Sequence, residues 1–245
     1  MKMNSIISSL LGFLFIVSCA TTSPKAEKAA YVPKFDYTPP EEAMKDTTGI
    51  SFGLVSAHYS EDQPWVSVWP FTQFSNNMEL DFQELLIARG FTVKGPFHAV
   101  EEMTYPDKKG CDLVLSPNIE VTLDLQDTKY EEVINLLGPN SYRLQGTAFI
   151  GGRVTLPMIE SLTGERMWLK SIDLPQTSVK WVGEKKYKTI PGSADLSDPG
   201  LTTALGPQME TFYNEVLETA WKYLHPEEMA IINKQSKELR ARKVY

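Results

Sequence analysis

The residue best placed for chemistry in this chain of 245 residues is Cys19, which follows Ile16, Val17 and Ser18 and precedes Ala20. A cysteine thiolate is a strong nucleophile, and with an alkyl donor it forms a stable thioether. Small residues on both sides leave the neighbouring peptide bond open to a peptidase. These residue types at this spacing predict that a lipid is attached to the Cys19 sulfur and that the chain is cut just before it.

A mostly apolar run of about twelve residues, from Ile6 to Val17, precedes Cys19 and follows Lys2. That length is typical of the apolar region of an export signal, and it is shorter than the roughly 20 residues that span a bilayer. Together with Cys19 it resembles the bacterial lipobox, so residues 1–18 are predicted to be a lipoprotein signal peptide. The alternative is a plain secretory signal with an incidental cysteine.

The lipobox implies a diacylglyceryl group on the Cys19 sulfur and an acyl group on the new amino terminus, with no other cofactor. Acyl chains contribute about 0.8 kcal/mol per buried methylene, so two or three of them hold a protein firmly on a bilayer. Ala20 stands where an inner-membrane retention signal would place Asp. The outer membrane is therefore the expected location.

Other catalytic or metal-binding patterns are missing from the sequence. It contains no Gly-x-Ser-x-Gly elbow, phosphate-binding loop or HExxH helix. The adjacent carboxylates Glu101-Glu102 and Glu131-Glu132 would point apart rather than converge. Cys111, beside an apolar stretch, is expected to be buried and inert, and it and three scattered histidines are too few for a zinc site. We expect no enzyme and no metal site.

Four tryptophans are the candidate ligand-binding residues, namely Trp65, Trp69, Trp168 and Trp181. An indole face packs well on a sugar ring, so they could form a sugar-stacking surface. The alternative is that they belong to the core or edge of a sheet. Gly151-Gly152 lies inside a β-rich run, where it predicts a bulge or a close backbone approach rather than a ligand cradle.

Composition is that of a globular protein, with 42% hydrophobic and 22% charged residues. The 24 Lys and Arg residues against 31 Asp and Glu leave a net charge of -7. Nucleic-acid affinity depends mainly on cationic side chains. Nucleic acid is therefore excluded as an expected partner.

Residues 19–48 are rich in Thr, Ser, Pro, Lys and Glu and predict a flexible, lipidated tether. Its aromatic residues Tyr31, Phe35 and Tyr37 could still dock onto the domain. Residues 49–245 predict a single α+β domain of one mixed, largely antiparallel sheet, with a helix after the second strand and a C-terminal helix pair packed on it.

Alternating or continuous apolar patterns predict the strands of this sheet. They cover residues 50–57, 65–69, 91–96, 111–125, 142–159 and 166–181, with a break at Pro117 and a hairpin turn over 160–165.

Helical spacing of apolar residues predicts a helix over Asn76 to Arg89, with Ser75 as its N-cap and Gly90 past its end. The clearest helix carries Leu205, Met209 and further apolar residues to Leu224 on one face. After Pro226 a last helix ends in basic residues. This end is expected to be solvated and frayed, although a basic end could instead meet anionic lipid.

The order of these pieces resembles the neuraminyllactose-binding haemagglutinin family, the Helicobacter-type surface lipoproteins also described as adhesins and flagellar sheath proteins. The matching stretches are residues 85–93, 154–165 and 233–243, through their hydrophobic, Gly and Lys/Arg patterns. The resemblance implies an outer-membrane lipoprotein with a sialylated host glycan as its ligand. The family's basic binding segment corresponds here to residues 126–132, which carry three acids and one base, so its binding residues are not carried over.

Two functions follow as hypotheses. The first is a non-enzymatic outer-membrane lipoprotein that is adhesin-like or structural, exposed on the cell surface or in a flagellar sheath, with a host glycan as a possible ligand. The second is an accessory lipoprotein that faces the periplasm and binds another envelope protein in cell-wall synthesis or flagellar assembly. In both, the lipid on Cys19 attaches the chain to a membrane.

Overall fold

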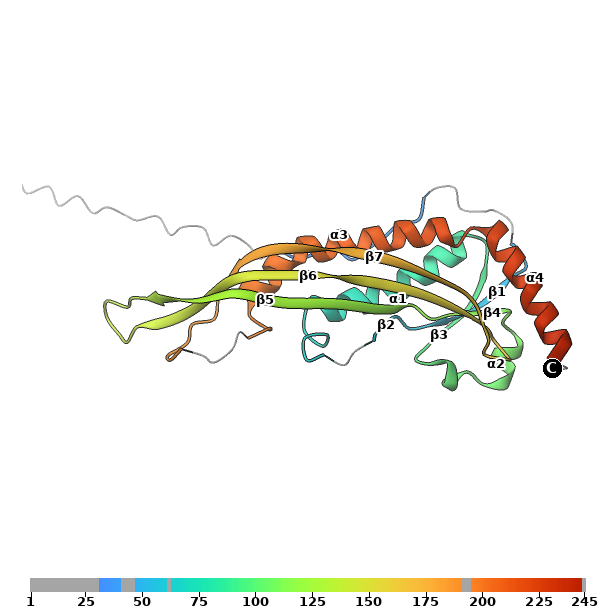
Figure 1. Ribbon diagram of the computed structural model, residues 1–245, viewed down its shortest axis with the longest axis horizontal. Coiled ribbons are helices and arrows are strands. Elements are labelled where there is room, and N and C mark those ends of the chain that lie inside the picture. The colour runs from blue at the N-terminus through green and yellow to red at the C-terminus, as the bar shows by residue number, and fades with distance from the viewer. Residues whose placement is uncertain (1–30, 41–46, 61–62, 191–194, 244–245) are drawn as a thin grey trace, which may run out of the picture. The chain divides into compact units, whose positions relative to one another are not determined.

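The sheet is built around one long antiparallel hairpin of β5 (Asn118–Val133) and β6 (Ser141–Glu160) in the computed structural model (Figure 1). The structure describes residues 31–40, 47–60, 63–190 and 195–243, which belong to one compact unit, Tyr31–Tyr245. Its seven strands and its helices confirm the predicted α+β class and mixed sheet. The proposed signal peptide and Cys19 lie outside the described residues.

On the edge that faces away from β5, strand β6 pairs with β7 (Arg166–Val182) in antiparallel fashion. The predicted turn over 160–165 connects these two strands. Beyond the start of β5 at Asn118, β4 (Leu113–Leu115) pairs with the last residues of β6. Strand β4 also pairs in parallel with β1 (Ser51–Val55), which in turn pairs in parallel with β3 (Thr92–Phe97). Strand β2 (His58–Tyr59) adds to β5. The predicted break at Pro117 is the gap between β4 and β5.

Gly151 and Gly152 mark an irregularity in the pairing of β6 with β7, as predicted. The pairing of β6 with β7 shifts register between Ile150 and Gly152. Gly152 has φ 145°, and a Cβ there would lie 1.9 Å from the Glu120 carbonyl oxygen. Only glycine has the freedom and the size for this approach.

The helices are α1 (Phe71–Ala88), a 3-10 turn at Val100–Glu102, α2 (Tyr105–Lys109), α3 (Pro199–Tyr223) and α4 (Pro226–Lys243). Helix α3 lies along the sheet and contacts β6, β7 and α1, and α4 contacts β7 (Figure 1). The apolar face of α3 is fully buried, as its spacing predicts. Within the described residues, none of these helices is long and apolar enough to cross a membrane.

The predicted strand at 65–69 is wrong. This segment forms consecutive turns, in which the Val66 and Val68 amides donate to the Gln63 and Trp65 carbonyl oxygens at 3.1 and 3.0 Å. Pro64 and Pro70 bracket the segment and cannot donate to a ladder. The second strand is instead the two-residue β2.

Helix α1 begins at Phe71, five residues before its predicted start. Ser75 is not its N-cap, because its hydroxyl donates to the Thr72 carbonyl oxygen within the helix at 3.1 Å. Phe71 and Phe74 are both buried in the core. The added burial of two aromatic side chains extends the helix beyond the polar start that the sequence favours.

The basic end of α4 is held to the domain by ion pairs and hydrogen bonds. This corrects the expectation that it would be solvated and frayed. Arg240 binds the buried Glu160 carboxylate and donates to the Cys111 carbonyl oxygen at 2.7 Å. Lys243 pairs with Glu165. The last helix is therefore fastened to the end of the β6–β7 hairpin.

Part of the predicted tether is folded onto the domain. Phe35 packs in the core against Phe74 and Tyr213, with ring centroids 5.6 and 5.2 Å apart. The Tyr37 amide donates to the buried Asp81 carboxylate at 2.8 Å. The tether predicted over 19–48 is thus interrupted by a segment that docks through its aromatic residues.

We expect Asn77→Ala to loosen this docked segment, because the Asn77 side-chain amide donates to the Phe35 carbonyl oxygen at 2.7 Å. The loss of one such hydrogen bond costs about 1 kcal/mol. Limited proteolysis should cut within residues 31–40 several times faster than in the parent. The exposed neighbour Asn76 gives the control Asn76→Ala, and equal cutting of the two variants would contradict this role.

Candidate functional site

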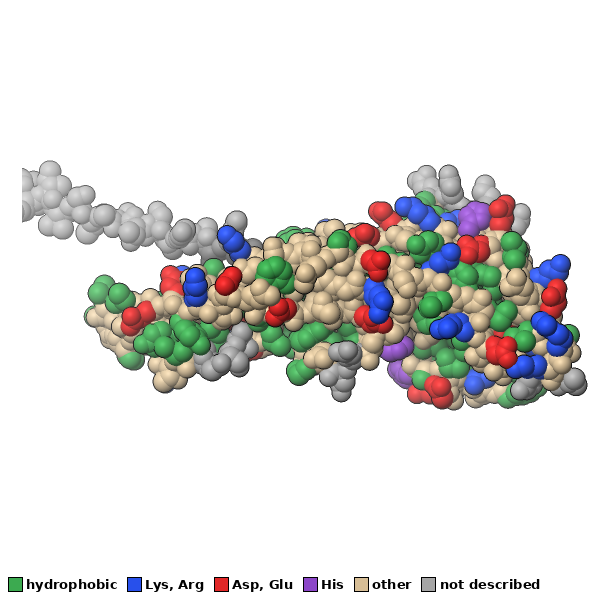
Figure 2. Space-filling model, in the orientation of Figure 1, with side chains coloured by type: hydrophobic (Ala, Val, Ile, Leu, Met, Phe, Trp, Pro, Cys, Tyr) green, Lys and Arg blue, Asp and Glu red, His purple; other side chains and the backbone are tan. Residues whose placement is uncertain are grey.

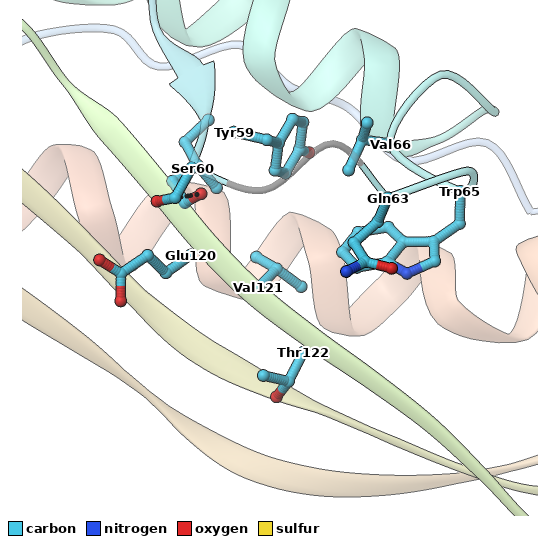
Figure 3. Close-up of a pocket in the computed structure, with 9 residues that line it drawn as sticks. Tyr59, Ser60, Gln63, Trp65, Val66, Glu120, Val121 and Thr122 are labelled. Carbon is cyan, nitrogen blue, oxygen red and sulfur yellow. Dashed lines mark hydrogen bonds between the residues drawn. The ribbon is translucent and has the colours of Figure 1, made fainter.

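A cleft of about 410 Å³ opens between the turn segment that follows β2 and the outer strand β5. Figure 3 shows Tyr59, Gln63, Trp65 and Val66 on one side, and Glu120, Val121 and Thr122 of β5 on the other. Ser60 and Ile119 complete the described lining. The volume lies within the range of small-molecule sites.

The floor of the cleft is apolar and held in place by the core. Trp65 is 7% exposed and its ring centroid lies 4.6 Å from that of Phe71. The Tyr59 hydroxyl donates to the Phe71 carbonyl oxygen at 2.8 Å, and burial raises its pKa. Tyr59 therefore stays protonated and structural.

The rim of the cleft carries polar groups from both sides. The Ser60 hydroxyl donates to the Asn118 amide oxygen at 2.9 Å, and this oxygen cannot take a proton at neutral pH. Glu120 pairs with Arg153 at 2.5 Å, so its carboxylate is already bound. The Thr122 hydroxyl, on the exposed face of β5, donates to the Gly151 carbonyl oxygen at 3.3 Å. This arrangement offers hydroxyl and amide groups to a ligand that has hydroxyl groups of its own, and its one carboxylate is paired with a guanidinium.

The four candidate tryptophans do not form one surface. Trp65 lies in the cleft, and Trp69 is partly buried in the turns before α1. Trp168 and Trp181 stand thirteen positions apart on β7, or about 40 Å along a strand. A single sugar-stacking patch cannot include both ends of β7.

The indoles of Trp168 and Trp181, at the two ends of β7, have different surroundings. The Trp168 Nε1 donates to the Glu228 carboxylate of α4 at 2.7 Å, and Lys170 lies 5.7 Å from its ring centroid. Trp181 is 2% exposed and packs in the core. Of the four indoles, Trp65 is the one that lines the cleft.

The other candidate groups keep structural roles. Cys111 is buried, and its burial raises the pKa of the thiol. Glu131 pairs with Arg143 at 2.7 Å, while Glu132 accepts from Asn140 at 2.8 Å, so the two carboxylates are used separately. Among the residues that the structure describes, no group of three His, Cys, Asp or Glu side chains could hold a metal ion.

Sequence reasoning missed most of the cleft lining, including Tyr59, Gln63 and Thr122. The alternation of β5 does indicate that Glu120 and Thr122 face away from the core. Nothing local shows that the turns around Trp65 fold back beside that strand. The sequence feature that could have indicated turns rather than a strand here is the pair of prolines that flanks the segment, Pro64 and Pro70.

The fold is an α+β domain with a small cleft beside its sheet. This fold is similar to the crystal structure of a protein described as a neuraminyllactose-binding hemagglutinin homologue from Helicobacter pylori, with a TM-score of 0.59 and 17% identity over 85% of this chain and 100% of that one. At this identity the likeness shows a shared fold, which agrees with the resemblance in the sequence.

Two further solved structures match with low TM-scores and carry no argument. One is a PelC dodecamer subunit from Paraburkholderia phytofirmans, with a TM-score of 0.27 and 13% identity over 66% of this chain and 88% of that one. The other is a lipoprotein from Neisseria meningitidis, with a TM-score of 0.28 and 12% identity over 58% and 88%. No family model and no curated protein matches the chain.

Proposed function

We propose that this chain is a lipid-anchored, non-enzymatic protein of the outer membrane that uses its folded domain for adhesin-like binding. The observation that carries the proposal is the cleft beside Trp65, with its apolar floor and its rim of hydroxyl, amide and carboxylate groups. Sites of this kind, mostly apolar with a few fixed polar groups, are typical of ligand binding. The lipobox supports the membrane anchor.

The ligand class follows from the charge of the rim. A sialylated glycan carries a carboxylate, which Glu120 would repel, although the Arg153 guanidinium partly offsets this charge. A neutral saccharide can pack on the apolar floor and bond to Gln63 or Thr122. We therefore expect neutral glycans to bind better than their sialylated forms, in contrast to what the name of the Helicobacter pylori homologue suggests.

Filling the cleft tests this proposal. Thr122→Phe places a large side chain at the exposed rim on β5 and should weaken binding of a neutral glycan at least about tenfold, or 1.4 kcal/mol. Asp124→Phe adds the same group two residues along the same face and should leave affinity unchanged. The measurement is calorimetric titration of the full mature chain against paired neutral and sialylated glycans. Flat titrations with both would refute the adhesin role.

Orientation on the membrane is tested separately. A surface adhesin must be cleaved when protease is added to intact cells, and its fragments should appear in the medium. Cleavage only after the outer membrane is opened would support the periplasm-facing alternative and contradict the adhesin role.

A further inference from the structure

The loop that joins β5 and β6 exposes large aliphatic side chains. Ile134, Leu136 and Leu137 are 72%, 94% and 103% exposed, the highest values among the large hydrophobic residues of the described chain. Figure 2 shows hydrophobic side chains at the far end of this hairpin. Exposed apolar groups that gather in one place mark an interaction site.

This loop projects beyond its neighbours rather than lining a groove. Strand β7 ends at Val182, opposite Gln145, so the last part of the β5–β6 hairpin extends beyond it (Figure 1). Tyr187 bridges to Tyr142 beside this extension. The residues from Val133 to Tyr142 include no charged side chain. A projecting, uncharged, aliphatic loop can insert into the fluid hydrocarbon of a lipid bilayer. It fits such an environment better than it fits the rigid pocket of a protein partner.

Charges appear directly behind the loop. Exposed Lys186 and Lys188 flank Tyr187, which bridges to Tyr142. Glu131 is bound by Arg143, and Glu132 accepts from Asn140. Exposed basic side chains behind an apolar loop are complementary to lipid phosphates, because lysine can keep its ammonium group at the headgroup level.

The folded domain begins at Tyr31, which lies beside the first half of α3. The Tyr31 hydroxyl donates to Glu210 in the first half of α3 at 2.5 Å. The N-cap of α3 is Asp198, whose carboxylate accepts from the Glu184 amide just after β7 at 2.8 Å. From Glu210 to the loop is at most about 55 Å, from the helical and strand rises and two steps of about 5 Å between neighbouring segments. The chain from Tyr31 back to Cys19 reaches about 40 Å when extended.

We propose that Ile134, Leu136 and Leu137 insert into the lipid bilayer that holds the acylated Cys19, so that the domain touches its membrane at two points. Both contacts can form on one membrane when the surface that the loop enters passes within about 40 Å of Tyr31. This inference rests on the lipid anchor of the proposed function. It adds a contact that fixes how the cleft is presented.

The test uses the full lipidated chain reconstituted in vesicles of phosphatidylethanolamine and phosphatidylglycerol. Asn135→Cys places an environment-sensitive fluorophore in the loop, while Cys111 is buried and does not react. Glu101→Cys places the fluorophore in the 3-10 turn, whose Val100 packs on the same cluster as Ile159 near the opposite end of β6. Quenching by spin-labelled lipid should reduce the loop signal at least about twofold, as for a group 5–10 Å below the headgroups. The Glu101→Cys label should not be quenched.

A triple variant, Ile134→Ser with Leu136→Ser and Leu137→Ser, should abolish the quenching at Asn135→Cys without unfolding the domain, because these side chains are outside the core. Protein that floats with the vesicles while both labels remain unquenched would overturn the inference and leave the anchor standing. A spectral shift of the loop label without lipid quenching would also overturn it, since this indicates a protein partner. Protein that does not float contradicts the anchor, and the inference fails with it.

Discussion

Cys19→Ser is expected to move the protein from the membrane fraction to the fraction released by osmotic shock. A hydroxyl is a far weaker nucleophile than a thiolate, so no thioether to diacylglycerol forms. Without acyl chains the remaining membrane contact is the loop at Ile134, Leu136 and Leu137, which is too small for stable anchoring by itself. Fractionation of cells followed by immunoblotting measures the result.

The matched control is Cys111→Ser, which changes the chain's other cysteine. Cys111 is buried beside β4 and has no role in the anchor. This variant should stay in the membrane fraction. If Cys19→Ser also stayed there, the anchor would have to be something other than a lipid on this sulfur.

Arg240→Met is expected to destabilise the domain by about 3–5 kcal/mol, because it leaves a buried carboxylate without its cation. The Glu160 side chain is 0% exposed and that of Arg240 is 19% exposed. Arg240 also donates to the Ser161 hydroxyl at 2.7 Å, so several elements lose a partner together. Urea unfolding followed by circular dichroism gives the free energy.

The loss of unfolding free energy in Arg240→Met should depend on pH. Burial raises the pKa of Glu160, but hydrogen bonds from the Thr163 and Leu162 amides and from Arg240 outweigh it, so the pKa lies below 4.5. A lowered pKa contributes stability above the unfolded value, which is lost as the pH falls through the folded pKa. In Arg240→Met the Glu160 carboxyl protonates more readily. The difference in unfolding free energy between parent and variant should therefore become smaller below about pH 4.5.

Two comparisons isolate this ion pair. Lys243→Met breaks the exposed pair with Glu165 and should cost less than about 1 kcal/mol. The double variant Glu160→Gln with Arg240→Met removes both charges and should recover part of the loss. A deficit for Arg240→Met below about 1 kcal/mol, or one that does not change with pH, would contradict a buried, charged Glu160.

The strands and helices with long apolar patterns could be predicted from the sequence. The hairpin turn over 160–165 and the face of α3 follow from local spacing, because one side of each element packs against the core. The bulge at Gly151-Gly152 also follows, since paired glycines inside a strand have few other uses.

Features set by tertiary contacts could not be predicted. Alternation of Trp and Val predicted a strand at 65–69, but its flanking prolines favour turns that bury Trp65. The basic end of α4 has the composition of a solvated helix, and only the fold brings Arg240 to Glu160. The cleft and the projecting loop depend on which segments meet, so single residues such as Thr122 and Leu137 gave no signal.

The central claim is that this protein is held on a membrane by a lipid on Cys19. Mass spectrometry of the N-terminal peptide of the mature protein, purified from membranes, tests it most directly. The account predicts a peptide that begins at Cys19 and carries the added mass of a diacylglyceryl group, with or without a further acyl chain. A mature N-terminus at any other residue, or an unmodified Cys19 thiol, would contradict it.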